Sequence, residues 1–207
     1  MNLPRPSKIV CVGRNYLEHA RELGNEMPEQ PLIFFKPPSS LIAHGEAIVL
    51  PPESERVEHE GEIAVVIGRR ARKVGAAEAW DHVAGIAPLN DVTARDLQKT
   101  DGQWTRAKGF DTFCPLGAVI PLEAIADRDA LEVVCRVNGE ERQRGRVGDM
   151  AFGIPALIEY ISGVMTLEPG DVIATGTPAG VSLLHPGDVV EVEIPGAGIL
   201  SNPVQAP

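Results

Sequence analysis

The chain of 207 residues is long enough for one domain with a sizeable core, and 43% of its residues are hydrophobic. Its formal net charge of −10 and its pI of about 5.0 argue against a nucleic-acid-binding or membrane-binding surface. No apolar run has the length of a membrane span, the N-terminus lacks the apolar region of a signal peptide, and three scattered cysteines form no disulfide or zinc pattern, so the sequence predicts a cytoplasmic protein.

The predicted helices and strands follow one another without regular alternation. In chain order, the sequence predicts a helix over residues 15–24, a strand over 63–68, a helix over 76–85, a hairpin over 133–143, a helix over 153–165, and strands within 168–176 and 185–194. The hairpin rests on Asn138-Gly139, a pair that favours a two-residue turn, and Asn15 is a possible N-cap of the first helix. Strands outnumber helices, which indicates an α+β fold that is mostly β rather than a doubly wound sheet.

Three carboxylates lead into the strand of residues 63–68. That strand is apolar on both faces, so it is expected to be buried on both sides. Glu58, Glu60 and Glu62 alternate along the chain and therefore point the same way, roughly 7 Å between successive ones. Acidic strand ends are often simply solvated. However, like charges about 5 Å apart repel by roughly 3 kcal/mol at an effective dielectric near 20, and a divalent cation would turn that repulsion into affinity.

Oxygen ligands of this kind favour Mg²⁺, Mn²⁺ or Ca²⁺ over zinc. Asp91 offers a further carboxylate, unless it serves only to cap the short helix that follows it.

Three other segments contain candidate functional side chains. His19 and Glu22 are spaced i, i+3 in the first helix, so they form either a carboxylate-oriented general base or an exposed ion pair. Lys108, in a loop rich in glycine and aromatic residues, is either a donor to a developing oxyanion or a surface lysine. The glycine-rich turn ATGTPAG can hold a carboxylate through its backbone N–H groups and the Thr177 hydroxyl, although such turns also occur without a ligand.

Six separated segments of the chain resemble the fumarylacetoacetate hydrolase superfamily in their order and spacing. They are VCVGRNYLEHARELG, FFKPPSSL, HEGEIAVVIG, NDVTARDLQ together with WTRAKGFDTFCPLG, VNGEERQ, and LEPGDVIATGTPAGV, within residues 8–195. The chain looks most like the single-domain acylpyruvate hydrolase and oxaloacetate decarboxylase branch. The segment between Gln98 and Trp104 is shorter than in the acylpyruvate hydrolases.

This resemblance implies a mixed β-sandwich roll with a few short helices, assembled as a homodimer. It also implies an Mg²⁺ or Mn²⁺ cofactor. The polar, Pro-punctuated stretch GNEMPEQP after the first helix predicts a lid-like helix within an N-terminal segment of residues 1–50, followed by one catalytic unit over residues 51–207. The implied metal ligands are Glu60, Glu62 and Asp91, the catalytic residues are His19, Glu22 and Lys108, and the substrate contacts are Arg95, Gln98 and Thr177. Glu58 is not among the implied ligands.

The implied function is that of a divalent-metal-dependent enzyme which cleaves C–C bonds in small 2-oxo acids through a metal-bound enolate. Acylpyruvate hydrolysis and oxaloacetate decarboxylation are the leading reactions. The alternative is a 2-hydroxyhepta-2,4-diene-1,7-dioate isomerase or a 5-carboxymethyl-2-oxo-hex-3-ene-1,7-dioate decarboxylase of aromatic catabolism. A metal-binding module without catalysis is disfavoured, because it would not need His19, Glu22 and Lys108.

Overall fold

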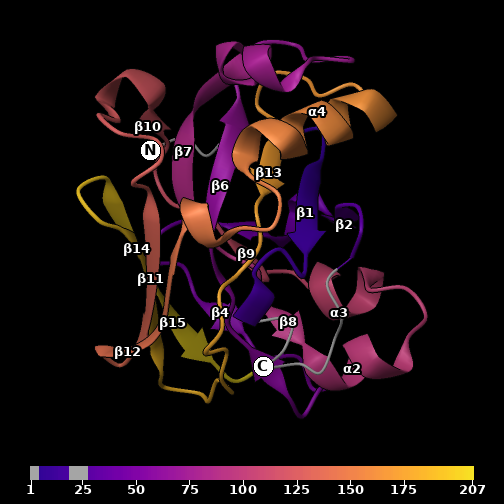
Figure 1. Cartoon of the computed structure of the whole chain (residues 1–207). Coiled ribbons are helices and arrows are strands. Elements are labelled where there is room, and N and C mark those ends of the chain that lie inside the picture. The colour runs from indigo at the N-terminus through magenta and orange to yellow at the C-terminus, as the bar shows by residue number, and fades with distance from the viewer. Residues whose placement is uncertain (1–4, 19–27) are drawn as a thin grey trace.

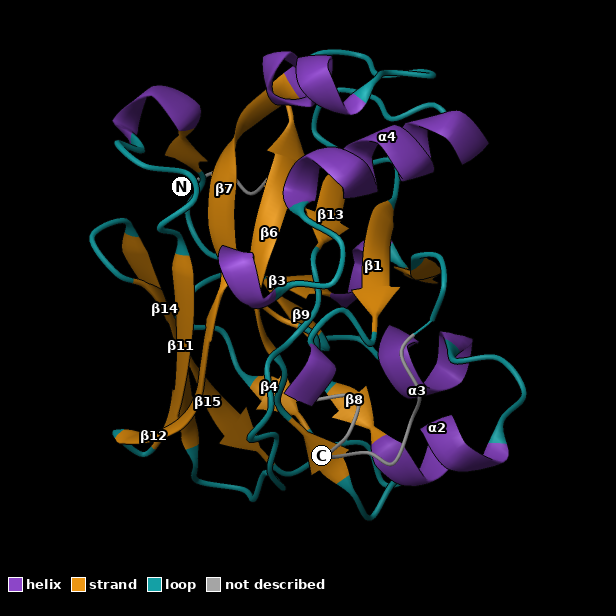
Figure 2. Ribbon diagram, viewed as in Figure 1, coloured by secondary structure: helices purple, strands orange, loops and turns teal. Residues whose placement is uncertain are grey.

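Two packed β-sheets form the centre of the molecule in the computed structural model, which describes residues 5–18 and 28–207 (Figure 1, Figure 2). Short helices lie on the outside of the sheets and beyond their ends. The expected α+β fold, mostly β, is confirmed. His19, Glu22 and most of the first predicted helix lie outside the described residues.

The larger sheet has six strands in the order β10–β7–β6–β13–β1–β2. They are β1 (Ile9–Gly13), β2 (Leu32–Lys36), β6 (Gly61–Ile67), β7 (Val83–Asn90), β10 (Ile120–Pro121) and β13 (Val172–Ala174). β1 and β13 are parallel, and the other neighbours are antiparallel. All seven residues of β6 are buried, so the predicted strand with two buried faces is confirmed. β1 and β2 precede the predicted division at residue 50, and they share this sheet with strands that follow it.

The smaller sheet has five strands in the order β12–β11–β14–β15–β4. They are β4 (Ile48–Val49), β11 (Glu132–Val137), β12 (Glu140–Arg146), β14 (Val189–Ile194) and β15 (Gly198–Gln205). The predicted hairpin is confirmed as β11 and β12, and its turn residues Asn138 and Gly139 both have the positive φ that such a turn requires. Two further pairs join β3 (Leu41–Ile42) to β9 (Cys114–Pro115) and β5 (Val57–Glu58) to β8 (Thr93–Ala94).

Two helical segments cover one face of the larger sheet. The helix α4 (Ile154–Val164) confirms the helix predicted over residues 153–165, and its apolar side chains pack on Val65 and Ile173 of the sheet. The 3₁₀ helix η2 (Ala76–His82) lies beside α4. The sequence predicted a longer helix here, over residues 76–85, but pairing of β7 with β6 holds the last residues of that range in a strand.

The remaining helices are short. They are α2 (Arg95–Thr100), α3 (Thr105–Gly109) and the 3₁₀ turns η1 (Pro38–Ser40), η3 (Leu122–Ala124) and η4 (Val147–Asp149). Figure 1 shows α2 and α3 next to each other beyond one end of the larger sheet, close to β8. None of the described helices is long and apolar enough to cross a membrane.

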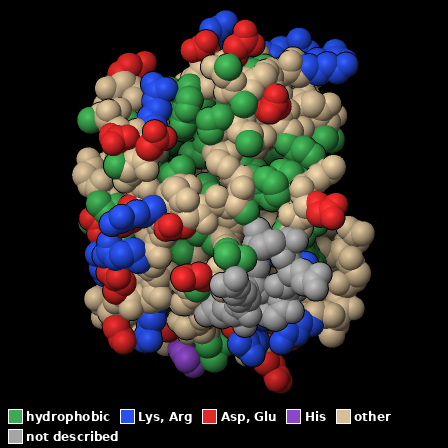
Figure 3. Space-filling model, viewed as in Figure 1, with side chains coloured by type: hydrophobic (Ala, Val, Ile, Leu, Met, Phe, Trp, Pro, Cys, Tyr) green, Lys and Arg blue, Asp and Glu red, His purple; other side chains and the backbone are tan. Residues whose placement is uncertain are grey.

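The main core lies between the two sheets. Ile63 of β6 and Ile86 of β7 belong to the same buried cluster as Val133 and Val192 of the smaller sheet. On the face shown in Figure 3, hydrophobic side chains gather over the upper half of the molecule, and most charged side chains lie toward its edges. Val164, at the end of α4, is 61% exposed.

Candidate metal centre and substrate pocket

The pairing of β6 with β7 brings three carboxylates together. Gly61 pairs with Asn90 in this antiparallel ladder, so the start of β6 meets the end of β7. Glu60 and Asp91 flank that pair, and the N–H of Asp91 donates to the carbonyl oxygen of Glu60 at 2.8 Å. One ligand atom each from Glu60, Glu62 and Asp91 lies within 4.8 Å of the other two, and all three residues are buried. These are the three predicted metal ligands.

Asp91 does not cap a helix, so that alternative interpretation is wrong. The helix α2 begins at Arg95, and its N-cap position is Ala94. The Asp91 carboxylate accepts a hydrogen bond from Lys36 Nζ through Oδ1 and from Lys108 Nζ through Oδ2, each at 2.7 Å. Two lysines therefore hold Asp91 beside Glu60 and Glu62.

Lys108 is a buried residue of the helix α3, so neither the predicted loop nor the surface alternative is correct. Its Nζ atom donates to Glu60 Oε2 and to Asp91 Oδ2, at 2.7 Å in both cases. The same atom lies 4.9 Å from the centroid of the Phe34 ring. Burial disfavours the ammonium form, but the carboxylates of Asp91 and Glu60 outweigh it and raise the pKa of Lys108. Lys108 is therefore a fixed cation at the carboxylate cluster.

Lys36 is a second buried lysine, which sequence reasoning missed. It ends β2, is 1% exposed, and donates to Asp91 Oδ1 at 2.7 Å and to the carbonyl oxygen of Val92 at 3.0 Å. The available signal was a lysine that directly continues the apolar run LIFF. A buried lysine needs a carboxylate partner, and that partner is 55 positions away in the sequence.

Glu58 lies outside the carboxylate cluster. It is buried and accepts hydrogen bonds from Arg95 Nε at 2.7 Å and from Arg56 Nε at 2.8 Å. Burial raises the pKa of Glu58, but the two arginines outweigh it, so the net pKa is lowered. Arg95 also contacts Glu60 Oε1 through Nη2 at 2.5 Å and donates to Gln98 Oε1 through Nη1 at 2.9 Å. Glu58 thus helps to fix Arg95, one of the predicted substrate contacts.

Glu62 differs from its two neighbours in having no ion pair with a lysine or arginine among the described residues. Its Oε2 atom accepts a hydrogen bond from the N–H of Gly176 at 2.8 Å. Burial, together with the negative charges of Asp91 and Glu60, raises the pKa of Glu62 well above its usual value. Three close carboxylates with oxygen donors only fit a hard divalent cation, which would supply the positive charge that Glu62 lacks.

Gly61, between the two glutamates, is the point where the carboxylate cluster contacts the smaller sheet. A Cβ atom on this residue would lie 2.8 Å from Cβ of Cys135 in β11. Its N–H donates to Gln143 Oε1 at 2.9 Å, and its carbonyl oxygen accepts from Thr177 Oγ1 at 2.8 Å. Only a residue without a side chain fits at this contact.

Thr177 is held by the same contact, which changes what it can offer a ligand. Its hydroxyl proton is used on the carbonyl oxygen of Gly61, and its Oγ1 atom accepts a hydrogen bond from Gln143 Nε2 at 2.7 Å. In the structure this hydroxyl is therefore already engaged within the protein, and its predicted contact with a ligand carboxylate stays a prediction.

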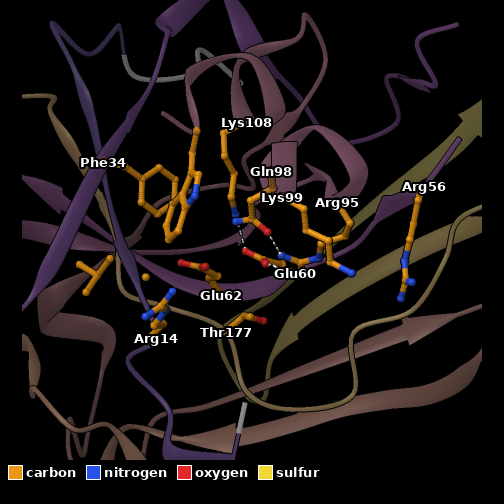
Figure 4. A pocket seen from close by; sticks show the side chains of 13 residues that line it. Arg14, Phe34, Arg56, Glu60, Glu62, Arg95, Gln98, Lys99, Lys108 and Thr177 are labelled. Carbon is orange, nitrogen blue, oxygen red and sulfur yellow. Dashed lines mark hydrogen bonds and ion pairs between the residues drawn. The ribbon is translucent and has the colours of Figure 1, made fainter. Parts of the chain in front are cut away.

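A cavity of about 450 Å³ opens onto the carboxylate cluster (Figure 4). Six of the predicted site residues line it, namely Glu60, Glu62, Arg95, Gln98, Lys108 and Thr177. Asp91 is buried and is not among the lining residues. Figure 4 shows Lys108, Gln98 and Arg95 on one side of Glu60 and Glu62, and Arg14 and Thr177 on the other. The walls of the cavity thus combine carboxylates with several cationic side chains, an arrangement that suits a cation together with an anionic ligand.

Known proteins resemble this chain over most of its length. The family model described as fumarylacetoacetate (FAA) hydrolase C-terminal matches residues 8–205. The chain is 51% identical to the mitochondrial oxaloacetate tautomerase FAHD1 of Arabidopsis thaliana, with 84% of the chain and 80% of that protein covered. It is 46% identical to the mitochondrial oxaloacetate decarboxylase of Dictyostelium discoideum, with 84% and 82% covered.

Among solved structures, the chain is similar to the 2-hydroxyhepta-2,4-diene-1,7-dioate isomerase from Mycobacterium marinum. The TM-score is 0.89 and the sequence identity 46%, and the match covers 98% of the chain and 75% of that structure.

Proposed function

Because the chain belongs to the fumarylacetoacetate hydrolase family, we propose that it is an enzyme which acts on oxaloacetate or a closely similar 2-oxo acid through an enolate. The observation that carries the proposal is the buried Lys108 ammonium, held by Glu60 and Asp91 at the cavity. A fixed cation at the edge of a water-poor pocket stabilises a negative charge that develops on a substrate oxygen.

The enolate is the common intermediate of two reactions. In decarboxylation the C3–C4 bond of oxaloacetate breaks, its electron pair moves onto the C2 oxygen, and CO₂ leaves. A proton then adds to C3 and yields pyruvate. In tautomerisation the C3 proton leaves and a proton adds to the C2 oxygen, with no loss of carbon. Both reactions place negative charge on the C2 oxygen, where Lys108 can donate a hydrogen bond.

The cofactor we propose is Mg²⁺ or Mn²⁺, held by Glu60, Glu62 and Asp91. When bound, such an ion would supply Lewis-acid stabilisation of the developing oxyanion. Arg95 is held by Glu58 and Glu60 at the same side of the cavity, so its guanidinium is positioned to orient a substrate carboxylate.

Acylpyruvate hydrolysis and isomerisation of unsaturated 2-oxo diacids remain the alternative proposals. Hydrolysis needs a water molecule activated by a general base, for which we propose His19 oriented by Glu22. Isomerisation would move a proton along a dienolate, and its support is the similarity to the Mycobacterium marinum isomerase.

We also propose that the protein acts as a cytoplasmic homodimer. All three cysteines are free and buried, which suits a reducing compartment. β2 is an edge strand of the larger sheet and its Phe35 is 48% exposed, so this edge is where we propose that a second copy contacts the chain. Light scattering after size-exclusion chromatography tests the dimer, and a monomeric mass at micromolar concentration would contradict it.

Purified protein incubated with oxaloacetate tests the main proposal. With Mg²⁺ or Mn²⁺ we expect either faster loss of the enol absorbance or faster formation of pyruvate than in buffer, and EDTA should remove the effect. Acetylpyruvate and the heptadienedioate serve as competing substrates in the same assay. Turnover of neither oxaloacetate nor acetylpyruvate with any of these ions would overturn the proposal.

A further inference from the structure

Two cationic side chains of the cavity, Arg14 and Lys99, form no ion pair with a carboxylate among the described residues, and of the two only Lys99 is exposed. Lys108 and Arg95 are paired with carboxylates of the cluster, and Arg56 is paired with Glu58. Arg14 also lines the cavity and is half-buried, but it forms no ion pair or hydrogen bond with any residue that the structure describes. Figure 4 shows its guanidinium group pointing into the cavity, across the glutamates from Lys108.

The backbone directs Arg14 into the cavity. β1 and β13 are parallel, with Cys11 paired to Ala174, so Arg14 and Thr177 each lie three residues beyond the last pair at the same edge of the sheet. Arg14 has a φ of 57°, in the left-handed region that residues other than glycine seldom adopt. Such strain persists only where the surroundings hold it, and it is concentrated at functional sites.

Hydrogen bonds of the Asn15 side chain hold the backbone next to Arg14 in place. Its Nδ2 atom donates to the carbonyl oxygens of Phe152 and Thr175 at 3.0 and 2.8 Å, and its Oδ1 atom accepts from the N–H of Phe152 at 2.9 Å. The possible N-cap role of Asn15 is therefore replaced by contacts to two distant loops. These contacts fix the chain immediately after Arg14, so the guanidinium remains at the cavity wall.

We infer that Arg14 binds the second carboxylate of the substrate and thereby selects 2-oxo diacids over 2-oxo monoacids. This inference rests on the proposed function, in which the first carboxylate and the 2-oxo group lie near Lys108 and Arg95. A diacid places its other carboxylate across the cavity, where an unpaired guanidinium can take it with two parallel hydrogen bonds. A monoacid has no second carboxylate for the Arg14 guanidinium to bind.

Binding of the C4 carboxylate by Arg14 would also affect which reaction oxaloacetate undergoes. CO₂ leaves as a neutral molecule, so a guanidinium that binds the C4 carboxylate stabilises the starting anion more than the transition state for decarboxylation. Arg14 therefore favours tautomerisation, which keeps the carboxylate, over decarboxylation.

Calorimetric binding in Mg²⁺-containing buffer tests the inference without turnover. The probes are 2-oxoglutarate, a stable 2-oxo diacid, and 2-oxobutyrate, a monoacid. Arg14→Asn removes the charge and keeps a residue that tolerates a left-handed backbone. We expect it to weaken 2-oxoglutarate binding roughly 10- to 100-fold, the size of a lost charge-assisted hydrogen-bond pair, with little change for 2-oxobutyrate. Arg14→Lys should give an intermediate loss.

Lys73→Asn is the matched control. Lys73 is also a cationic residue with a positive φ, of 53°, but it is exposed and does not line the cavity. We expect this variant to bind both probes like the wild type. With oxaloacetate as substrate, the ratio of decarboxylation to tautomerisation should rise in Arg14→Asn and stay constant in Lys73→Asn.

Three results would overturn the inference: a wild type with no preference for the diacid probe, equal losses for both probes in Arg14→Asn, or an unchanged reaction ratio. If Arg14 served only to neutralise Glu62, Arg14→Asn would change the affinity for Mn²⁺ and leave the diacid preference intact, which also contradicts the inference. A wild type that binds 2-oxoglutarate through Arg14 but turns over neither oxaloacetate nor acetylpyruvate would contradict the proposed function alone.

Discussion

Arg95 Nε lies 2.7 Å from Glu58 Oε2, and both side chains are almost completely buried. Removal of one partner from a buried ion pair costs up to roughly 3–5 kcal/mol of unfolding free energy, and without Glu58 the buried Arg95 would keep only Glu60 as a carboxylate partner. We therefore expect Glu58→Ala to be strongly destabilised in urea denaturation, and Glu58→Gln, which keeps an acceptor for Arg95, to be affected less. Because Glu58 is outside the carboxylate cluster, Mg²⁺ should still raise the melting temperature of both variants. Loss of that effect would show that Glu58 is a ligand.

Glu62→Gln should separate metal binding from folding. Glu62 has no ion pair with a described lysine or arginine, so its neutralisation leaves no lysine or arginine without its carboxylate partner. It also removes the repulsion between Glu62 and the carboxylates of Asp91 and Glu60. The variant without metal is expected to melt at a higher temperature than the wild type. Stabilisation by Mn²⁺, about 2.7 kcal/mol for the wild type at 100 times the dissociation constant, should disappear. A variant that keeps it would remove Glu62 from the proposed ligand set.

His19 is expected to contribute mainly to hydrolysis, whereas Lys108 is expected to contribute to both hydrolysis and decarboxylation. A general base contributes roughly 10²- to 10⁴-fold to hydrolysis, whereas decarboxylation needs no activated water. His19→Ala should therefore strongly reduce acetylpyruvate cleavage and have a much smaller effect on the decarboxylation of oxaloacetate. Lys108→Ala should slow both reactions, because both pass through the same enolate. The measurement is kcat/KM for the two substrates. An equal loss on both substrates for His19→Ala would instead indicate that His19 positions the substrate.

Asp171 should make the stability of the fold depend on pH in the acid range. Its buried carboxylate accepts hydrogen bonds from Lys8 Nζ and from the N–H groups of Ser7 and Glu168. Burial raises its pKa, but these donors outweigh burial, so the net pKa of Asp171 is lowered. A lowered pKa stabilises the folded state above the unfolded value of about 3.9, and that contribution is lost as the pH falls through the folded value.

Asp171→Asn tests this point. At pH 7 we expect it to lose roughly 1.5–3 kcal/mol of unfolding free energy, the range for hydrogen bonds to a charged group. The difference from the wild type should narrow as the pH falls below about 4. A difference that stays constant down to pH 2 would mean that ionisation of Asp171 does not stabilise the fold.

Local patterns predicted the elements well, but they did not predict the ion pairs of the site. β6 was predictable because its residues are apolar on both faces, and the hairpin because Asn138-Gly139 specifies its own turn. The lengths of η2 and α2 were not predictable, since pairing with distant strands sets where each helix begins or ends. Local propensity cannot report such pairing.

In the candidate site, too, the sequence predicted what local patterns or the family resemblance specify and missed what long-range pairing specifies. The grouping of Glu60, Glu62 and Asp91 was expected from the family resemblance, and the register between β6 and β7 supplies its physical reason. Lys36 was missed because its partner is set by that register and not by its own neighbours in the sequence. The hydrogen bond of the Thr177 hydroxyl was not foreseen because its acceptor, Gly61, lies 116 positions away.

The contact at Gly61 makes the distance between the two sheets a determinant of where Glu60 and Glu62, two of the proposed metal ligands, are placed. Glu60 and Glu62 are attached to the only residue that separates them, and that residue rests against Cys135 of the opposite sheet. Any change that widens the sandwich at β11, such as a larger side chain in place of Cys135, would pull on both ligands at once although it touches neither. Substitutions that repack this core would therefore also change the affinity of the proposed site for a divalent ion. A measurement of ion binding would then report on core packing, as a melting curve does.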